Sequence, residues 1–279
     1  MALGLIAAGT GTGTVVLPPL SRYLISGYGW QTTYAILGLA IWLFVISASL
    51  VLRRDPEAMG LRPYGREAGG VGLGGKAGIS FSAALRRRSL WVLSTMHLLT
   101  AVALQMVMTH LVNYATDADI TPLVAASFVS FIGGTSVFGR VLVGGASDKI
   151  GKRRAFFICT AANTLAILWL TQASVPWMLY AFGVFFGFFY GGWIPMFPAL
   201  AAELFGTEHL AAIYGVVSMA SGIGGVIGPF LAGYLFDLSA SYTLAFFLGA
   251  LAMGLATLSV LFLGRAGPRE VGQAQPVLK

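Results

Sequence analysis

Long apolar runs, separated by short charged or proline-containing connections, dominate the pattern of hydrophobic and polar positions along the chain. A helix that crosses the hydrocarbon core of a bilayer needs about 20 consecutive apolar residues. Eight runs reach this length, and each predicts one membrane-spanning helix. Their approximate bounds are 3–25, 32–52, 90–114, 122–146, 155–173, 175–200, 211–236 and 242–263. The pattern therefore predicts an all-α membrane protein.

Composition agrees with this pattern and removes several other classes of protein. Hydrophobic residues make up 57% of the 279 residues and charged residues only 10%, against about 25% charged residues in an ordinary soluble domain. A soluble globular domain is therefore excluded. Cys159 is the single cysteine, so neither an internal disulfide nor a zinc site built from thiolates can form.

Basic residues gather in alternate connections between the predicted helices. Fifteen of the seventeen lie in the connections at one side of the membrane or in the C-terminal tail, at 53, 54, 62, 66, 76, 86, 87, 88, 149, 152, 153, 154, 265, 269 and 279. The positive-inside rule predicts that this side is cytoplasmic. Both termini are then expected in the cytoplasm, and the expected location is a plasma membrane or the inner membrane of a bacterium. Because the net charge of +7 follows loop parity and forms no stripe, no nucleic-acid partner is expected.

The longest connection, 53–88, is rich in glycine and arginine and is typical of a flexible cytoplasmic linker. It divides the chain into two helices within 1–52, six helices within 89–264, and a cytoplasmic tail at 265–279. Its last part, ISFSAALRRR, allows two interpretations. It is either an interfacial helix with Ile79, Phe81, Ala84 and Leu85 facing lipid, or a solvated loop.

The segment GRVLVGGASDKIGKRR at 139–154 crosses the end of one predicted helix and the start of the next. Gly144 and Gly145 would let helices approach closely, and Asp148 could cap or pair at the helix end. A donor cluster at the level of the lipid headgroups is expected from the basic residues. An ordinary positive-inside loop is the alternative. The residues concerned are Gly145, Asp148, Lys149, Gly151, Lys152, Arg153 and Arg154.

This segment resembles the signature loop of the major facilitator superfamily. Four further segments are similar to its monocarboxylate-carrier and oxalate/formate-antiporter branch: PPLSRYLISGYGW (18–30), PEAMGLRPYG (56–65), FSAALRRRSLWVLS (81–94) and GVIGPFLAGYLFDLSASYTLAF (225–246). The resemblance implies the superfamily's fold of twelve helices in two bundles of six. By its order the eight helices correspond to helices five to twelve, with a complete C-terminal bundle and the last two helices of the N-terminal bundle. A truncated member, a fragment and a gene model begun at an internal Met all stay open.

Arg140 is the clearest ionisable residue inside a predicted membrane helix, and such residues are candidates for function. Its fork of N–H donors suits a carboxylate, and the resemblance implies an arginine at the matching place in the carriers. Snorkelling toward headgroups is the alternative. The sequence departs from the family in two ways: Ser136 stands where the monocarboxylate carriers tend to have an Asp, and no Lys occurs between Arg153 and Lys279, where the oxalate exchangers use one in helix eleven. These departures favour a singly charged anion over a dicarboxylate.

Other polar and aromatic positions are weaker candidates. Contact with substrate is predicted for Gln105, Tyr190, Trp193, Tyr214 and Ser218, although aromatic residues near helix ends usually anchor the helix at the interface. A proton path could use His110 and Asn113, which neighbouring helices could equally well satisfy. Pro195 and Pro198 predict a bend in the 175–200 helix.

The function expected from these features is secondary active transport of small organic anions, monocarboxylates above all, by alternating access. The expected partners are the bilayer, the anion and a coupled proton; a protein partner is not identified. No enzyme activity, metal or cofactor is expected, because Cys159 stands alone and His97, His110 and His209 lie at different depths or faces. The alternative is a transport-incompetent half-transporter or subunit that needs a partner for further helices.

Overall fold

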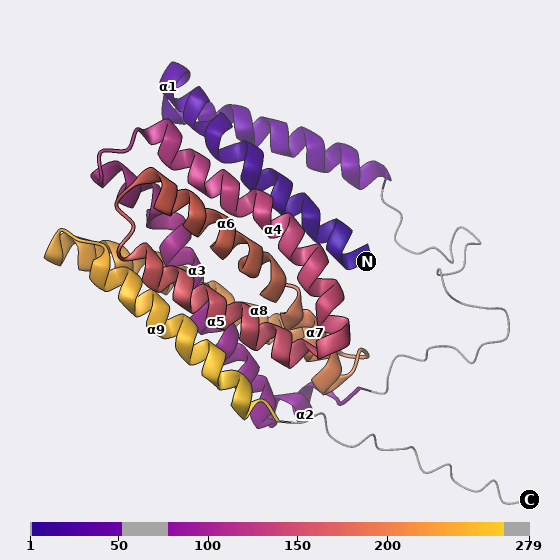
Figure 1. The fold of residues 1–279 in the computed structure, drawn as a ribbon. Coiled ribbons are helices and arrows are strands. Elements are labelled where there is room, and N and C mark those ends of the chain that lie inside the picture. Colours follow the sequence, from indigo (N-terminus) through magenta and orange to yellow (C-terminus); the bar gives the residue numbers. More distant parts are fainter. Residues whose placement is uncertain (1, 52–77, 265–279) are drawn as a thin grey trace, which may run out of the picture.

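The computed structural model describes residues 2–51 and 78–264, and the side chains of 2–12, 14 and 51 fall outside this description. Residues 53–77 of the predicted linker 53–88 and the tail 265–279 also lie outside it. Helices account for every regular element of the described part, as Figure 1 shows. Their bounds are α1 Ala2–Val51, α2 Phe81–Leu85, α3 Arg88–Asp117, α4 Pro122–Ile150, α5 Lys152–Leu170, α6 Pro176–Trp193, α7 Met196–Phe205, α8 Leu210–Ser239 and α9 Thr243–Ser259, followed by a 3₁₀ turn at Val260–Phe262.

α1 consists of two arms that lie side by side in Figure 1. The chain reverses at Gly29, whose φ of 76° and ψ of 166° are non-helical and are readily adopted only by glycine. The Thr33 hydroxyl donates to the Gly29 carbonyl at 2.8 Å and closes the turn. The two predicted spans 3–25 and 32–52 are these two arms.

The first arm of α1 packs against α4. Pro19 has no N–H, so the carbonyl of Val15, four residues earlier, lacks its usual helical donor. The Ser130 hydroxyl of α4 donates to this carbonyl at 3.0 Å. This hydrogen bond from Ser130 links the first arm of α1 to the bundle, and it is possible because Pro19 leaves the Val15 carbonyl without a helical donor.

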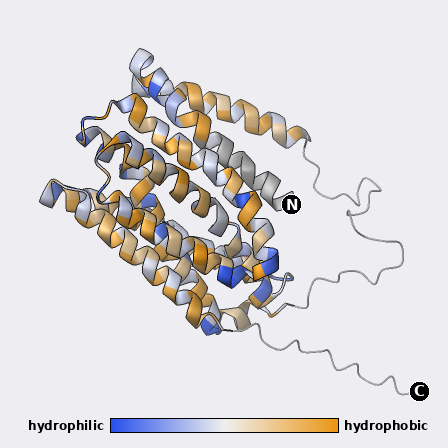
Figure 2. Ribbon diagram, in the orientation of Figure 1, coloured by the Kyte–Doolittle hydropathy of each residue, from blue (hydrophilic) through white to orange (hydrophobic). Residues whose placement is uncertain are grey.

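α3 to α9 form the bundle below α1 in Figure 1. α3 lies against α8 and α9, α4 against α6, and α5 between α6 and α9. Figure 2 shows apolar residues along the lengths of these helices, with polar ones toward their ends. By length and composition, six stretches of the described residues can cross a membrane: Val15–Leu50, Arg88–Asp117, Pro122–Ile150, Pro176–Phe205, Leu210–Ser239 and Thr243–Phe262.

The difference from eight predicted spans has two sources. The arms of α1 form one continuous stretch, and α5, which is the predicted span 155–173, begins with three basic residues that lower its mean hydropathy. The predicted span 175–200 contains a bend, because α6 ends at Trp193 and α7 starts at Met196. Pro195 stands at this break, as the sequence predicted.

Close helix packing occurs at glycines of α6 and α8. A Cβ at Gly187 or Gly191 of α6 would overlap the backbone of α4, and one at Gly183 would press against it. A Cβ at Gly224 or Gly228 of α8 would overlap the carbonyls of Leu98 and Val102 in α3. The small residues therefore let α6 approach α4, and α8 approach α3, at backbone-contact distance.

Close helix packing was expected at Gly144 and Gly145, and this expectation was wrong. Nothing lies within 4 Å of a Cβ built at either residue. The tight contact of α4 is made one to two turns earlier, at Gly139, where a Cβ would overlap the carbonyl of Phe188.

The segment at 79–88 is a helix at α2, but its orientation differs from the expected one. Ser80 caps α2 by accepting from the N–H of Ala83 at 3.3 Å. Ala84 is fully buried, and Ile79 and Leu85 pack against the core, whereas Phe81 is exposed. The predicted lipid-facing set is therefore wrong for three of its four members, because α2 packs on α3 and α8.

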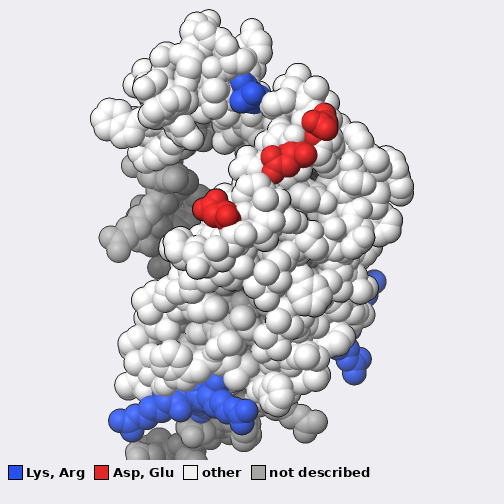
Figure 3. Space-filling view, turned by 90° about the vertical axis from the view of Figure 1, so that its left-hand side faces the viewer, with Lys and Arg blue, Asp and Glu red and all other residues white. Residues whose placement is uncertain are grey.

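Charged side chains separate toward the two ends of the molecule. Figure 3 shows acidic groups in the upper part of one face and the largest basic group at its lower edge, with a single basic group near the top. In the described chain, Asp117 and Asp237 lie near the ends of α3 and α8, and Lys149 and Arg153 lie where α4 and α5 meet. This is the separation expected from alternating helices with basic connections on one side.

We predict that Gly224→Ala lowers the thermal unfolding temperature of the purified chain in detergent, whereas Gly222→Ala does not. The added methyl at residue 224 would overlap Leu98, and overpacking costs about 1–3 kcal/mol. Gly222 lies two residues away with nothing within 4 Å of its Cβ, so alanine there should be neutral or stabilising by up to about 1 kcal/mol. Equal changes in the two variants would contradict the proposed α3–α8 contact.

Candidate functional site

Arg140 lies on α4 with only 5% of its surface exposed. The hydroxyl of Tyr190, on α6, is within hydrogen-bonding reach of its guanidinium. The guanidinium is thus enclosed by helices and is not extended toward the headgroups, as snorkelling would require. Arg140 and Tyr190, both predicted as substrate contacts, are brought together.

The register between Arg140 and Tyr190 is set by the residues next to them. Gly139 lies against the carbonyl of Phe188, and Gly191 lies against the carbonyl of Ser136. Each contact leaves no room for a Cβ, so α4 cannot slide along α6 without a steric clash. The packing of two glycines therefore holds the cation and the hydroxyl side by side.

Trp193 lies next to Tyr190, with 5.9 Å between ring centroids, and is 1% exposed. In the amide orientation that satisfies its neighbours, buried Asn163 of α5 accepts from the Trp193 indole N–H at 3.0 Å and donates to the Phe186 carbonyl at 3.2 Å. The hydrogen bond with Asn163 therefore fixes the orientation of the Trp193 indole. Sequence reasoning did not single out Asn163, although a lone amide in an apolar run was a usable signal.

Ser136, where the carriers tend to have an Asp, is 1% exposed. Its hydroxyl donates to the Gly133 carbonyl at 2.7 Å, within α4. This side chain thus brings no charge to Arg140 and is satisfied by its own helix.

The other predicted substrate contacts lie on α3 and α8 and form a second group. Tyr214 is within hydrogen-bonding reach of Ser218, and its ring lies 6.3 Å from that of His97. His97 in turn stacks on Phe197 at 3.9 Å and places its Nδ1 3.3 Å from the Val217 carbonyl. Gln105 is exposed on α3, where its Cγ would contact a Cβ at Gly225.

The two predicted proton-path residues lie in the second half of α3. His110 places Nδ1 3.4 Å from the Tyr242 hydroxyl and Nε2 3.0 Å from the Pro229 carbonyl. Asn113 is within hydrogen-bonding reach of the same hydroxyl. Both residues therefore meet at Tyr242, which sequence reasoning missed because it is about 130 residues away along the chain.

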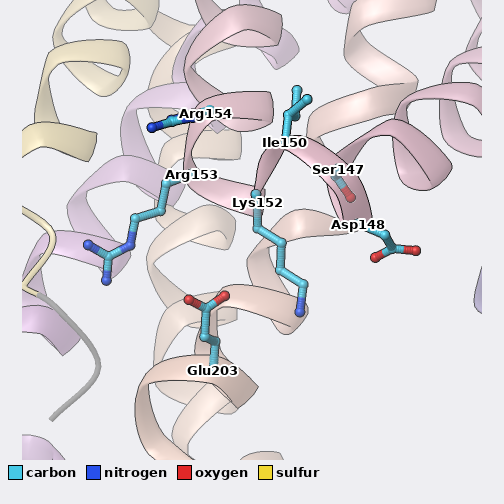
Figure 4. Close-up of a pocket in the computed structure, with 8 residues that line it drawn as sticks. Ser147, Asp148, Ile150, Lys152, Arg153, Arg154 and Glu203 are labelled. Carbon is cyan, nitrogen blue, oxygen red and sulfur yellow. The ribbon is translucent and has the colours of Figure 1, made fainter. Parts of the chain in front are cut away.

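The signature loop is a single residue long. α4 ends at Ile150, Gly151 has a φ of 90°, and α5 begins at Lys152. A cavity of about 370 Å³ opens here, as Figure 4 shows. Its walls come from the end of α4, the start of α5 and α7: Ser147, Asp148, Ile150, Gly151, Lys152, Arg153, Arg154 and Glu203.

Arg153 has a more specific role than the expected headgroup contact. Its guanidinium donates to the carbonyl of Leu263 at 2.8 Å and also to that of Gly264. These carbonyls follow the 3₁₀ turn after α9, where backbone acceptors lack helical donors. Arg153 therefore ties the start of α5 to the end of α9, whereas Arg154 is exposed.

Within residues 2–51 and 78–264, no group of three or more His, Cys, Asp or Glu side chains could hold a metal ion. The guanidinium of Arg140 carries N–H donors in the fork geometry that matches a carboxylate.

Comparison with known proteins then decides the family. The chain matches the Major Facilitator Superfamily over residues 1–170 and again over 120–277. The chain belongs to the major facilitator superfamily. Two crystal structures of the E. coli fucose:proton symporter FucP, one in its outward conformation, superpose with a TM-score of 0.59 at 17% identity over 87% of this chain and 58% of theirs. At this identity the likeness shows the fold alone.

Relatives within the superfamily carry the name of monocarboxylate transporters. Monocarboxylate transporter 12 of Xenopus laevis is 24% identical over 271 residues, which cover 91% of this chain and 59% of the relative. Monocarboxylate transporter 13 of Bos taurus is 27% identical over 249 residues, covering 88% and 55%. The chain thus spans somewhat more than half the length of these relatives. It is a membrane protein with a partial major facilitator fold.

We predict that Arg153→Gln lowers the thermal unfolding temperature and exposes the end of α9 to amide exchange. The variant loses two hydrogen bonds from a charged donor, worth about 1–3 kcal/mol together. Arg154→Gln is the matched control, because an exposed neighbour should change stability by no more than about 0.5 kcal/mol. Hydrogen exchange followed by mass spectrometry checks residues 255–264. Unchanged exchange in Arg153→Gln would rule out the tie to α9.

Proposed function

We propose that the chain carries the anion site of a secondary active transporter for small organic anions, above all monocarboxylates. The observation that supports this most is the buried guanidinium of Arg140 beside the Tyr190 hydroxyl. A guanidinium can give a carboxylate two parallel hydrogen bonds. The phenol can accept from the guanidinium and donate its own proton to the same carboxylate, which would orient the anion.

The energetics favour an anion as the occupant. A buried guanidinium attracts an anion by its charge and offers it several N–H donors, whereas a neutral substrate brings no opposite charge. The names of the relatives support the carboxylate class, and the absence of a Lys between Arg153 and Lys279 supports a single negative charge on the substrate.

Alternating access would use the division of the chain predicted from sequence. In this proposal residues 1–52 belong to one bundle, 53–88 form the linker, 89–264 form the second bundle and 265–279 the tail. The first arm of α1 contacts α4, the helix that carries Arg140. Rocking of α1 against α4 would therefore open or cover the side of α4 on which it packs, and a bound anion would bias the two states.

The proposed location is a plasma membrane, or the inner membrane of a bacterium, with both termini in the cytoplasm. The grouping of Lys149, Lys152 and Arg153 at one end of the described bundle supports this orientation by the positive-inside rule.

A second candidate function is that of a subunit that transports only when a partner supplies further helices. It is favoured by the exposure of two stretches. In their most apolar parts, only 6% of the residues of Val15–Leu50 and 17% of those of Leu210–Ser239 are buried, whereas 44–56% are buried in the other stretches that can cross a membrane. Helices with so little burial can pack against lipid or against another protein.

We expect the purified chain, reconstituted in liposomes loaded with unlabelled lactate, to accumulate labelled lactate by counterflow. Arg140→Gln should reduce the initial rate about ten- to a hundredfold, the cost of a lost charge-assisted pair. Arg140→Lys should retain part of the rate, because it keeps the charge but loses the fork.

The matched control is Arg22→Gln, which removes an exposed arginine of α1 and should leave the rate unchanged. An unchanged rate in Arg140→Gln would refute the anion site. Counterflow that is absent from the chain alone, but present after reconstitution with a co-purified membrane protein, would favour the second candidate function.

A further inference from the structure

His110 joins three segments at the end of the bundle opposite the signature loop. Its Nε2 lies 3.0 Å from the Pro229 carbonyl of α8, and its Nδ1 lies 3.4 Å from the hydroxyl of Tyr242, which precedes α9. The two rings are 5.3 Å apart. Gly228, the last tight α3–α8 contact, is next to Pro229, so the histidine continues the seam between these helices.

The partners fix the tautomer of the neutral ring. A carbonyl only accepts, so Nε2 must carry the hydrogen and donate to Pro229. Nδ1 then has its lone pair free and accepts from the hydroxyl of Tyr242. Both nitrogens of the neutral ring are therefore satisfied.

The same partners also satisfy the protonated ring. A second proton on Nδ1 turns this nitrogen into a donor, and the phenolic oxygen of Tyr242 can accept from it. The Tyr242 hydrogen then points to Asn113, whose side chain is within reach and whose amide offers an oxygen after rotation. Reversing two hydrogen bonds thus accommodates the proton without moving a helix.

We propose that His110, Tyr242 and Asn113 form a reversible proton-binding site that links α3 to α8. The site does not depend on the anion that Arg140 binds. Histidine is the side chain whose charge ordinarily changes between pH 5 and 8, and the proton taken up comes from water at the nearer membrane surface.

The charged and titratable groups around the site come from α3, α8 and the segment before α9. Asp117 at the end of α3 and Asp237 near the end of α8 are both close enough to act on Tyr242. Tyr114 is occupied, because its hydroxyl donates to the carbonyls of Ala173 at 2.7 Å and Leu170 at 3.1 Å. α9, the remaining neighbour, has no ionisable residue between Thr243 and Ser259. The charged side chains of α3 and α8 at this end are therefore acidic, and the arginine of α3, Arg88, lies at the opposite end of its helix.

Tyr242 keeps its proton over the working range of the site. Burial raises the pKa of this phenol, the hydrogen bond with Asn113 lowers it, and the carboxylates of Asp117 and Asp237 raise it further. Since an ordinary tyrosine already titrates near pH 10, the hydroxyl is neutral between pH 5 and 8. It can therefore serve both as donor and as acceptor.

The test is a pH titration of the ¹⁵N-histidine-labelled chain in lipid nanodiscs, followed by nitrogen chemical shifts. Single variants His97→Gln and His209→Gln assign the two other histidines. We expect His110 to carry hydrogen on Nε2 alone at pH 8 and on both nitrogens at pH 5. A ring that keeps the neutral form throughout this range would overturn the proposal.

Tyr242→Phe tests the role of the hydroxyl while keeping the ring that stacks on Phe236 at 4.4 Å. The cationic form loses the stronger hydrogen bond, so at the pH where half of wild-type His110 is protonated we expect about a tenth in the variant. Tyr234→Phe, on the exposed part of α8, is the control. Identical titrations of wild type and Tyr242→Phe would remove Tyr242 from the site. These shifts are read whether or not the chain transports lactate.

Discussion

The structure depends above all on the need to satisfy backbone polar groups where lipid replaces water. In hydrocarbon an unpaired carbonyl costs several kcal/mol, so each interruption of a helix must find a donor. Pro19 leaves the Val15 carbonyl without a helical donor, and Ser130 of α4 supplies one. At the end of α9, Arg153 donates to Leu263 and Gly264. These two contacts between helices thus lie where a helix is broken or ends.

Glycine contacts between helices also position the polar side chains next to them. The α4–α6 seam leaves no space for a Cβ at Gly139 or Gly191, and each of these residues adjoins a polar side chain. The result is a fixed pairing of Arg140 and Tyr190. The close contacts of Gly139 and Gly191 therefore fix the position of the buried Arg140 side chain.

The α3–α8 seam has the same construction with different chemistry at its end. Its glycine contacts lead to Pro229, whose carbonyl accepts from His110. One seam therefore ends at the guanidinium of Arg140 and the other at the imidazole of His110. Arg140 lies on α4 and His110 on α3, and these two helices pack against each other.

The sequence by itself determined the membrane class, the two arms of α1, the separation of charges, the bend at Pro195 and the break at the signature loop, because these follow from local hydropathy and backbone preference. It was wrong about Gly144 and Gly145, and it missed Tyr242, because the neighbour of a helix face is set by residues far away in the chain. Only the tertiary structure brought such partners together: His110 and Pro229 are 119 positions apart, a separation that no local pattern encodes.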